Sequence, residues 1–294
     1  MNTDAAVVVG ADGSPDALRA VEWAAADASR RHRPLRIVYA CPWPTVYAPL
    51  AMPAGPPPLF EETMRQAAEQ IIDEAVASAR VVAPELEIST DVPIQQPTAA
   101  LTDASRHACA VVVGNRGLGG FSGLLLGSVG VQLAAHAACP VVVVRQADRP
   151  PGPEAGRVVV GVDGSHDAER ALAFAFEQAS FRAVGLTAVD AYRWPSSTGP
   201  GDMLPLVYDP AELRDDEDRA LTEAIAGWAG KYPDVDVRRA VANGRAAAVL
   251  VELSAGAELV VVGSRGRGGF TGLLLGSVSQ AVIHHAACPV AVVR

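Results

Sequence analysis

Two segments of the chain combine glycine and serine in a spacing that could bind phosphate. One reads GNRG at residues 114–117 and, after nine further residues, GS at 127–128; the other reads GSRG at 263–266 and, again after nine, GS at 276–277. Glycine lets a backbone approach a ligand without a Cβ atom in the way. A helix that begins at Gly-Ser also presents free N–H groups and the positive end of its dipole. We therefore predict two polyphosphate sites; the alternative is a tight turn with an ordinary serine N-cap.

An aspartate follows the first apolar strand of each half, Asp12 in GADGS and Asp163 in GVDGS. In a doubly wound sheet, ligands bind beyond the carboxyl ends of the strands, where the strand order reverses. If the first strand lies beside the fourth, each aspartate faces a glycine-rich turn. There it could accept hydrogen bonds from ribose hydroxyls or hold a metal through water; the alternative is a capping or turn aspartate.

These motifs occur twice because the chain contains an internal duplication. GGFSGLLLGSV at 119–129 returns as GGFTGLLLGSV at 268–278, and flanking segments return in the same order at a separation of about 150 residues. A length of 294 residues suits two domains. We predict domains at 1–146 and 157–294, joined by a polar, proline-rich linker at 147–156.

Each half alternates short apolar runs with helical patterns. Ser14-Pro15-Asp16 is a helix start, with an N-cap, a proline at the first position and an early acid. This alternation predicts an α/β fold with two tandem doubly wound, Rossmann-like parallel sheets of five strands, covered by helices on both faces. We expect strands at 7–10, 35–40, 87–94, 110–114, 141–144, 158–161, 185–190, 235–242, 259–263 and 290–293, and further helices in the first half near 60–82, 98–108 and 128–138.

Composition excludes several classes of function. The net charge of −9 argues against a nucleic-acid partner, and Lys231, the only lysine, lies far from any glycine cluster, which excludes a Walker-A loop. The four cysteines lack metal-ligand spacing and fit reduced thiols in a cytoplasmic protein. No signal peptide is indicated. Glycines and Pro140 interrupt the apolar run at 124–144, so we expect no membrane span.

The motifs GxDGS after the first strand, G-2x-G-9x-G-S after the fourth and a closing CPVVVV strand resemble the universal stress protein family in its tandem form, and the glycine spacing resembles its ATP-binding branch. The resemblance implies the strand order 3-2-1-4-5 and one adenine-nucleotide site in each half, with ATP, alone or with Mg, as the ligand. By this resemblance Asp12 and Asp163 contact the adenosine, while the glycines and serines hold ribose and phosphates. The residues expected at the nucleotide are Gly10, Asp12, Ala40, Cys41, Gly114, Arg116, Gly117, Gly127, Ser128 and Val129 in the first half, and Gly161, Asp163, Asp190, Ala191, Gly263, Arg265, Gly266, Gly276, Ser277, Val278 and Ser279 in the second.

Three departures from the family pattern affect individual positions. The Gly-x-Pro before the third helix is only half kept, as QQP at 95–97 and GRA at 244–246. The second half keeps a serine two places after the phosphate serine, Ser279, where the first has Gly130. Asp190 places an acid at the expected adenine edge, where it could lower occupancy or pair with the exocyclic amine. Arg116 and Arg265 could face either phosphate or solvent.

The resemblance implies a cytoplasmic ATP-binding regulatory protein of the stress response, whose nucleotide occupancy changes its conformation or its choice of an unidentified protein partner. It also implies that the halves pack as a pseudo-twofold pair through 141–145 and 290–294, with a homodimer as a further option. No residue set looks catalytic, since there is no HExxH or GxSxG motif, so weak ATP hydrolysis is the most we expect. The alternatives are a hydrolase-like enzyme of adenine nucleotides, a dinucleotide oxidoreductase whose glycines would follow the wrong strand, and a scaffold with vestigial pockets.

Overall fold

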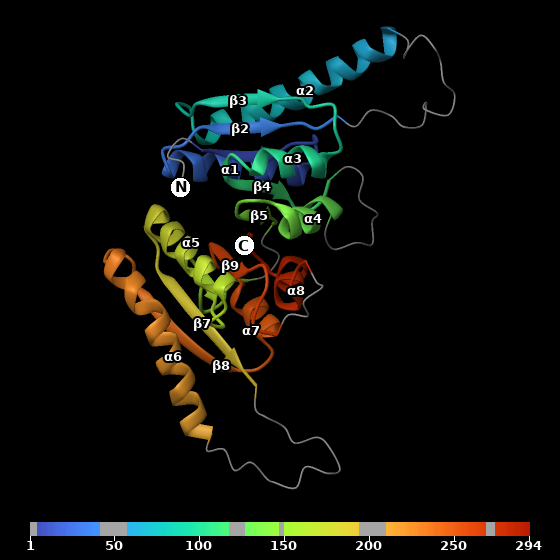
Figure 1. The fold of residues 1–294 in the computed structure, drawn as a ribbon. Coiled ribbons are helices and arrows are strands. Elements are labelled where there is room, and N and C mark those ends of the chain that lie inside the picture. The colour runs from blue at the N-terminus through green and yellow to red at the C-terminus, as the bar shows by residue number, and fades with distance from the viewer. Residues whose placement is uncertain (1–4, 42–57, 118–126, 147–149, 194–209, 269–273) are drawn as a thin grey trace, which may run out of the picture. The chain divides into compact units, whose positions relative to one another are not determined.

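The computed structural model describes residues 5–41, 58–117, 127–146, 150–193, 210–268 and 274–294, and of 58–61 and 210–211 only the backbone. The chain divides into two compact units, Met1–Gln146 and Ala147–Arg294 (Figure 1). The expected pairing of the two halves stays a prediction.

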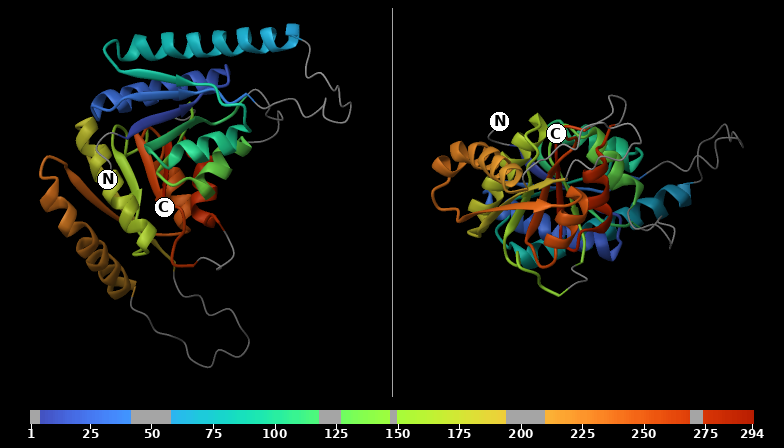
Figure 2. Two further views of the ribbon diagram at one scale, coloured as in Figure 1. Left: turned by 45° about the horizontal axis from the view of Figure 1, so that its top comes forward. Right: turned by 90° about the horizontal axis from the view of Figure 1, so that it is seen from below.

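The first unit is a five-stranded parallel sheet in the order β3-β2-β1-β4-β5. Helix α1 packs beside α2, and α3 packs beside α4 (Figure 2). The connections through α1 and α2 run toward the β3 edge of the sheet, and those through α3 and α4 run toward the β5 edge. Because such crossovers are right-handed, the two pairs of helices cover opposite faces of the sheet. The elements are β1 Ala6–Gly10, α1 Pro15–Arg30, β2 Leu35–Val38, α2 Pro58–Val82, β3 Ile88–Asp91, α3 Pro97–Ser105, β4 Ala108–Gly114, α4 Ser128–His136 and β5 Val141–Val144.

The second unit repeats this topology, with the parallel order β10-β9-β6-β7-β8. The predicted doubly wound fold and its order 3-2-1-4-5 are therefore confirmed for each half. The elements are β6 Val158–Gly161, α5 His166–Arg182, β7 Leu186–Tyr192, α6 Pro210–Lys231, β8 Val237–Asn243, α7 Ala246–Leu253, β9 Leu259–Gly263, α8 Ser277–His285 and β10 Val290–Val293.

The core of each unit is built from strands buried on both faces. In β5 all four valines are buried, as expected for a parallel sheet with helices on either side. Helix α1 turns an alanine face toward the sheet, with Ala20, Ala24 and Ala28 fully buried. Its start follows the sequence, because the Ser14 side chain accepts a hydrogen bond from the N–H of Ala17 and Pro15 occupies the first turn.

Several boundaries differ from those that the sequence predicts. Strand β2 ends at Val38 rather than Ala40, and β3 covers only Ile88–Asp91. The N–H of Tyr39 still donates to Asp91 O and that of Cys41 to Pro93 O in the same register. Pro93, however, has no N–H to donate back, so the paired ladder ends there. The proline-rich stretches near 42–57 and 194–209 lie outside the described residues.

The described part of the expected linker belongs to the second unit. The N–H of Gly152 donates to Ala255 O at 2.8 Å, and that of Gly156 donates to Gly256 O at 2.9 Å. The guanidinium of Arg157, which is 8% exposed, then reaches Asp236 at 2.7 Å and the Thr187 hydroxyl at 3.0 Å. Residues 150–157 are thus anchored to the sheet and helices that follow them.

The described residues contain no helix of the length and apolarity needed to cross a membrane. The apolar run at 124–144 contributes α4 and β5, separated by Pro140, and its first three residues lie outside the described part.

Candidate functional site

Each unit contains a pocket at the carboxyl ends of its central strands. The pocket of the first unit has a volume of about 530 Å³ and that of the second about 390 Å³, within the range of small-molecule sites. Asp12 and Ser128 line the first pocket together, and Asp163 and Ser277 line the second. Motifs more than 100 residues apart in the sequence therefore meet at one place in each unit.

Of the residues expected at the nucleotide, Cys41 alone does not line a pocket. Its neighbour Ala40 does, but the N–H of Cys41 is bonded to Pro93 O in the turn toward α3. In the second half both Asp190 and Ala191 line the pocket. By strand register Ala191 matches Ala40, and Cys41 matches Tyr192, which does not line its pocket either.

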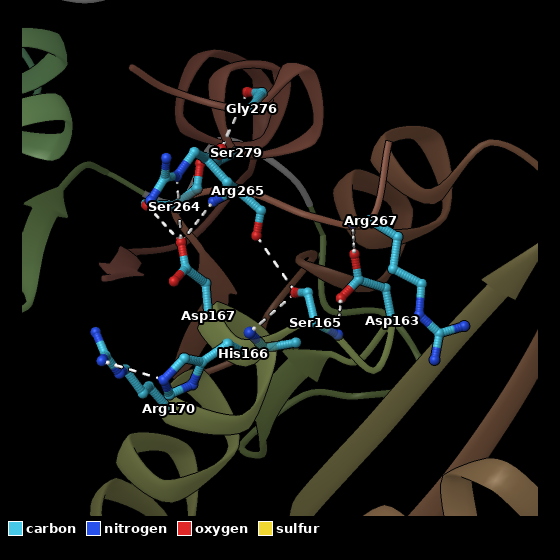
Figure 3. Close-up of polar contacts among 11 residues, drawn as sticks. Asp163, Ser165, His166, Asp167, Arg170, Ser264, Arg265, Arg267, Gly276 and Ser279 are labelled. Carbon is cyan, nitrogen blue, oxygen red and sulfur yellow. Dashed lines mark hydrogen bonds and ion pairs between the residues drawn. The ribbon is translucent and has the colours of Figure 1, made fainter. Parts of the chain in front are cut away.

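In the second unit, Asp163 joins the turn after β6 to the turn after β9. Oδ1 of Asp163 accepts a hydrogen bond from the N–H of Ser165 at 3.0 Å, and Oδ2 accepts one from the N–H of Arg267 at 3.0 Å (Figure 3). A Cβ atom on Gly266 would overlap this Oδ2 atom. The turn can therefore approach the carboxylate only because residue 266 is glycine.

The described residues of the first unit share the bond within the turn and the close approach of the glycine. Oδ1 of Asp12 accepts from the N–H of Ser14 at 3.0 Å, and a Cβ atom on Gly117 would overlap Oδ2. Each aspartate therefore acts as a turn aspartate, as the alternative interpretation expects, because it accepts a hydrogen bond within its own turn. Each also lines its pocket.

The helices α4 and α8 begin with glycine caps. Gly127 and Gly276 are the N-cap residues, and no side-chain cap bond is made at either helix. The N–H of Gly127 donates back to Asn115 O at 2.9 Å, and that of Gly276 donates to Ser264 O at 2.8 Å. Ser128 and Ser277 are therefore the first helical residues rather than caps, and both are exposed. Their hydroxyls and the N–H groups of the first helical turn, which have no carbonyl partner within the helix, are available to a ligand.

The second pocket has a brace that involves Asp167. Oδ2 of Asp167 accepts hydrogen bonds from the Ser264 hydroxyl at 2.8 Å and from the N–H of Arg265 at 3.2 Å. The hydroxyl of Ser279, which is 2% exposed, lies 2.9 Å from Ser264 O and 3.0 Å from Gly276 O. Sequence reasoning gave this hydroxyl to the phosphate, whereas here it joins α8 to the glycine-rich turn (Figure 3).

The first unit lacks this brace. Asp16 pairs with Arg19 instead, and the side-chain oxygen of Asn115 accepts from Nη2 of Arg145 at 3.0 Å. Gly130 stands where the second half has Ser279, so no hydroxyl can bridge the helix and the turn.

The two arginines of the glycine-rich turns contribute their backbone. The carbonyl of Arg116 accepts from the Ser14 hydroxyl at 3.3 Å, and that of Arg265 accepts from the Ser165 hydroxyl at 3.4 Å. Both arginines are exposed at the pocket. Nε of Arg265 lies 3.8 Å from Asp167.

Apolar side chains also line each pocket, and sequence reasoning missed them. Leu101 of α3 and Leu250 of α7 line the two pockets. A Cβ atom at Gly10 would lie 2.9 Å from Leu101, and one at Gly161 would lie 3.0 Å from Leu250, so the glycines that end β1 and β6 admit these leucines. The remaining lining residues that were not predicted are Ala11, Ala17, Val38, Pro97, Val113 and Gly130 in the first pocket and Val162, Ala168, Val189, Ala246, Val262, Arg267, Gly268 and Leu275 in the second.

One lining residue has a strongly shifted pKa. Burial, together with a hydrogen bond and a like charge from Glu217 of α6, raises the pKa of Asp190 to about 7; Arg267 opposes the shift and Asp163 adds to it. Tyr39 holds the matching position in the first unit, since Gly10 pairs with Val38 as Gly161 pairs with Val189. Burial raises the pKa of Tyr39 as well, so its phenol is neutral at physiological pH.

Among the described lining residues, neither pocket has a cysteine or a histidine. No group of three or more histidine, cysteine, aspartate or glutamate side chains that could hold a metal occurs among the described residues. Burial raises the pKa of Cys139 to about 12, which keeps that thiol protonated.

The family model for universal stress proteins matches residues 5–145 and again residues 154–294. The chain belongs to the universal stress protein family. It carries the family domain twice, and its relatives are of similar length. A universal stress protein of Mycobacterium tuberculosis is 40% identical over 312 residues, covering 99% of this chain and 96% of the relative. Another, from Mycobacterium bovis, is 41% identical over 297 residues, covering 98% and 96%.

Solved structures of universal stress proteins share the fold. One from Archaeoglobus fulgidus has a TM-score of 0.67 at 21% identity and covers 99% of this chain and 97% of its own. A putative universal stress protein from Pseudomonas aeruginosa has a TM-score of 0.60 at 17% identity and covers 99% and 92%. At these identities the likeness establishes a common fold for this universal stress protein and those structures.

Proposed function

We propose that each pocket binds an adenine nucleotide, with ATP as the ligand, and that the chain is a cytoplasmic regulatory protein of the stress response. The observation that carries the proposal is the pairing, in both units, of a fixed carboxylate with the start of a helix across one pocket. The repetition matters because a turn that served packing alone would need neither an open helix start nor an aspartate facing the cavity.

The apolar and polar lining residues of each pocket suit the two ends of a nucleotide. Leu101 and Val38 in the first unit, and Leu250 and Val189 in the second, offer an apolar slot for a base. The aspartates can accept hydrogen bonds from ribose hydroxyls. The exposed serines Ser128 and Ser277, at the starts of α4 and α8, would bind the triphosphate.

Several weak groups must act together on the phosphates. A helix dipole contributes only about 0.3–1 kcal/mol, and hydrogen bonds to a charged group contribute about 1.5–3 kcal/mol each. Two or three amides and one hydroxyl would therefore suffice for micromolar binding, for which about 8 kcal/mol is needed when the base is also buried. Arg116 and Arg265 are long enough to add a charge from the rim.

The donor set fits ATP better than it fits a tightly held metal. Among the described residues, the carboxylates that line the pockets are Asp12, Asp163 and Asp190, and two of them already accept hydrogen bonds from the turns. A magnesium ion would thus arrive on the phosphates, with Asp12 or Asp163 reaching it through water. Its role there would be to neutralise phosphate charge.

A regulatory role is favoured over an enzymatic one by the groups that line the helix starts. Neither set of lining residues contains a histidine, lysine, cysteine or glutamate, so no evident base faces the expected position of the γ-phosphate. The presence or absence of bound nucleotide would then be the signal. In the second unit it would act by ordering the two turns that Asp163 joins.

The experiment is identification of the small molecules released from freshly purified protein by denaturation. Mass spectrometry should find an adenine nucleotide at up to two molecules per chain, and Gly117→Glu or Gly266→Glu should each halve that amount. Absence of nucleotide, together with no calorimetric ATP binding at millimolar concentration, would favour a scaffold with vestigial pockets. Sustained turnover of ATP with an added acceptor would favour an enzyme.

A further inference from the structure

The two pockets differ in the charged groups that line them. Asp12 and Arg116 are the charged residues of the first pocket, whereas the second has Asp163, Arg265 and two additional groups, Asp190 and Arg267. The additional groups have no charged equivalent in the first half, where Tyr39 matches Asp190 by strand register and the sequence has Leu118 in the place of Arg267.

Asp190 belongs to a cluster that three other elements complete. Glu217 from α6 is hydrogen-bonded to it, Arg267 from the turn after β9 attracts it, and Asp163 from the turn after β6 repels it. A hydrogen bond between two carboxyl groups requires one proton between them. The guanidinium of Arg267 packs against Gly164, where a Cβ atom would overlap it. The glycine thus leaves room for the guanidinium beside these acids at the pocket.

The protonation of this cluster decides the charge that a ligand meets. With Asp190 ionised, two carboxylates and two guanidinium groups line the second pocket and their charges cancel. With Asp190 protonated, one guanidinium is left in excess. Among its described lining residues, the first pocket has one charge of each sign. Tyr39, which matches Asp190 by register, does not line that pocket, and burial raises the pKa of its phenol. The burial and the carboxyl neighbours that raise the pKa of Asp190 to about 7 place this change within the physiological range.

We propose that Asp190 sets the ligand preference of the second pocket, which binds anionic nucleotide more tightly as the pH falls through neutrality, while the first pocket does not share this dependence. The inference rests on the proposed nucleotide binding and adds a difference between the two sites. One chain would then hold a site that responds to nucleotide alone and a site that responds to nucleotide and pH together.

The test compares the two pockets in the full chain, one at a time. Gly117→Glu blocks the first pocket and Gly266→Glu the second, and ATP is titrated into each variant by calorimetry at pH 8 and pH 6. ATP itself gains protons in this range, but it does so equally in both titrations, so the ratio of the two affinities isolates the protein. Between pH 8 and pH 6 we expect the affinity of the second pocket, divided by that of the first, to rise by about fivefold. One proton allows at most a tenfold change in affinity per pH unit, so this rise lies below the limit.

Two further variants identify the group responsible. When Asp190→Asn is added to the Gly117→Glu chain, the affinity of its second pocket, divided by that of the first pocket in the Gly266→Glu chain, should no longer change with pH. Glu217→Gln should move the transition to lower pH, because it removes a neighbour that raises the pKa of Asp190. Circular dichroism checks that each variant folds. If the Asp190→Asn variant does not fold, Asp190→Tyr replaces it in the test, because tyrosine is the residue at the matching position of the first half.

The outcomes separate this inference from the function on which it rests. Parallel pH profiles at the two pockets, or a shift that survives Asp190→Asn, would overturn the inference and leave nucleotide binding intact. Lack of ATP binding at both pockets and both pH values would overturn the proposed function, and the inference with it.

Discussion

Substitution of Gly266 by alanine tests the link between the aspartate and the glycine-rich turn. The new Cβ atom would overlap Oδ2 of Asp163, so the carboxylate must rotate and give up the hydrogen bond from the N–H of Arg267, which measures 3.0 Å. A hydrogen bond to a charged group contributes about 1.5–3 kcal/mol. For a domain of this size each kcal/mol corresponds to about 2–4 °C, so the melting temperature of the second unit should fall by about 3–12 °C.

Gly268→Ala is the matched control for this prediction. Gly268 lies two residues along the same turn, lines the same pocket, and has nothing within 4 Å of the position that a Cβ atom would take. Scanning calorimetry measures both melting temperatures, and titration with ATP measures affinity, which should fall at least tenfold for Gly266→Ala (about 1.4 kcal/mol). Equal melting temperatures and equal affinities for the two variants would refute the role assigned to the aspartate.

Three other perturbations have defined outcomes. Arg157→Met should destabilise the second unit by about 2–3 kcal/mol in denaturant melts, because the buried guanidinium bonds Asp236 and Thr187; a change below 0.5 kcal/mol would contradict this. Ser279→Ala should cost about 1 kcal/mol and weaken ATP binding in the second pocket only, whereas Gly130→Ala should leave that pocket unaffected. The stability of the second unit should decline as pH rises from about 4 to about 7, because the folded state binds the Asp190 proton more tightly than the unfolded state does; Asp190→Asn should remove this decline, and an unchanged pH profile would argue against the shifted pKa.

The fold could be predicted from the sequence because duplication supplied each signal twice. Apolar runs such as 7–10 and 158–161 identified buried strands, and Ser14 marked a helix start that the structure has at the next residue. Boundaries were less accurate where long-range hydrogen bonds decide them. The end of β2 at Val38 depends on its neighbour β3, because Pro93 has no N–H to return a bond to the strand, and the local propensity of residues 35–40 does not encode this.

The polar half of the site was also visible in the sequence, but its apolar half was not. Glycine, serine and aspartate at strand ends are unusual enough to be noticed. A buried leucine such as Leu101 or Leu250 looks the same whether it faces a pocket or the core. The same holds for Glu217, whose position beside Asp190 arises only when α6 packs against β7.

Ser279 shows the limit of carrying a residue role over from a family pattern. The serine is present and lies at the pocket, yet its hydroxyl is 2.9 Å from the carbonyl of Ser264 and is buried. The spacing of the motif specifies where the residue lies; the direction of its proton depends on the neighbouring turn, which the sequence does not reveal.

Native mass spectrometry of the chain with ATP tests the central claim most directly, since the claim is that two equivalent arrangements of amides, serine and carboxylate each hold one nucleotide. We predict two bound nucleotides in the unmodified chain, one each in Gly117→Glu and Gly266→Glu, and none when both substitutions are present. Two nucleotides retained by the doubly substituted, folded chain would contradict the account, because the ligand would then bind elsewhere.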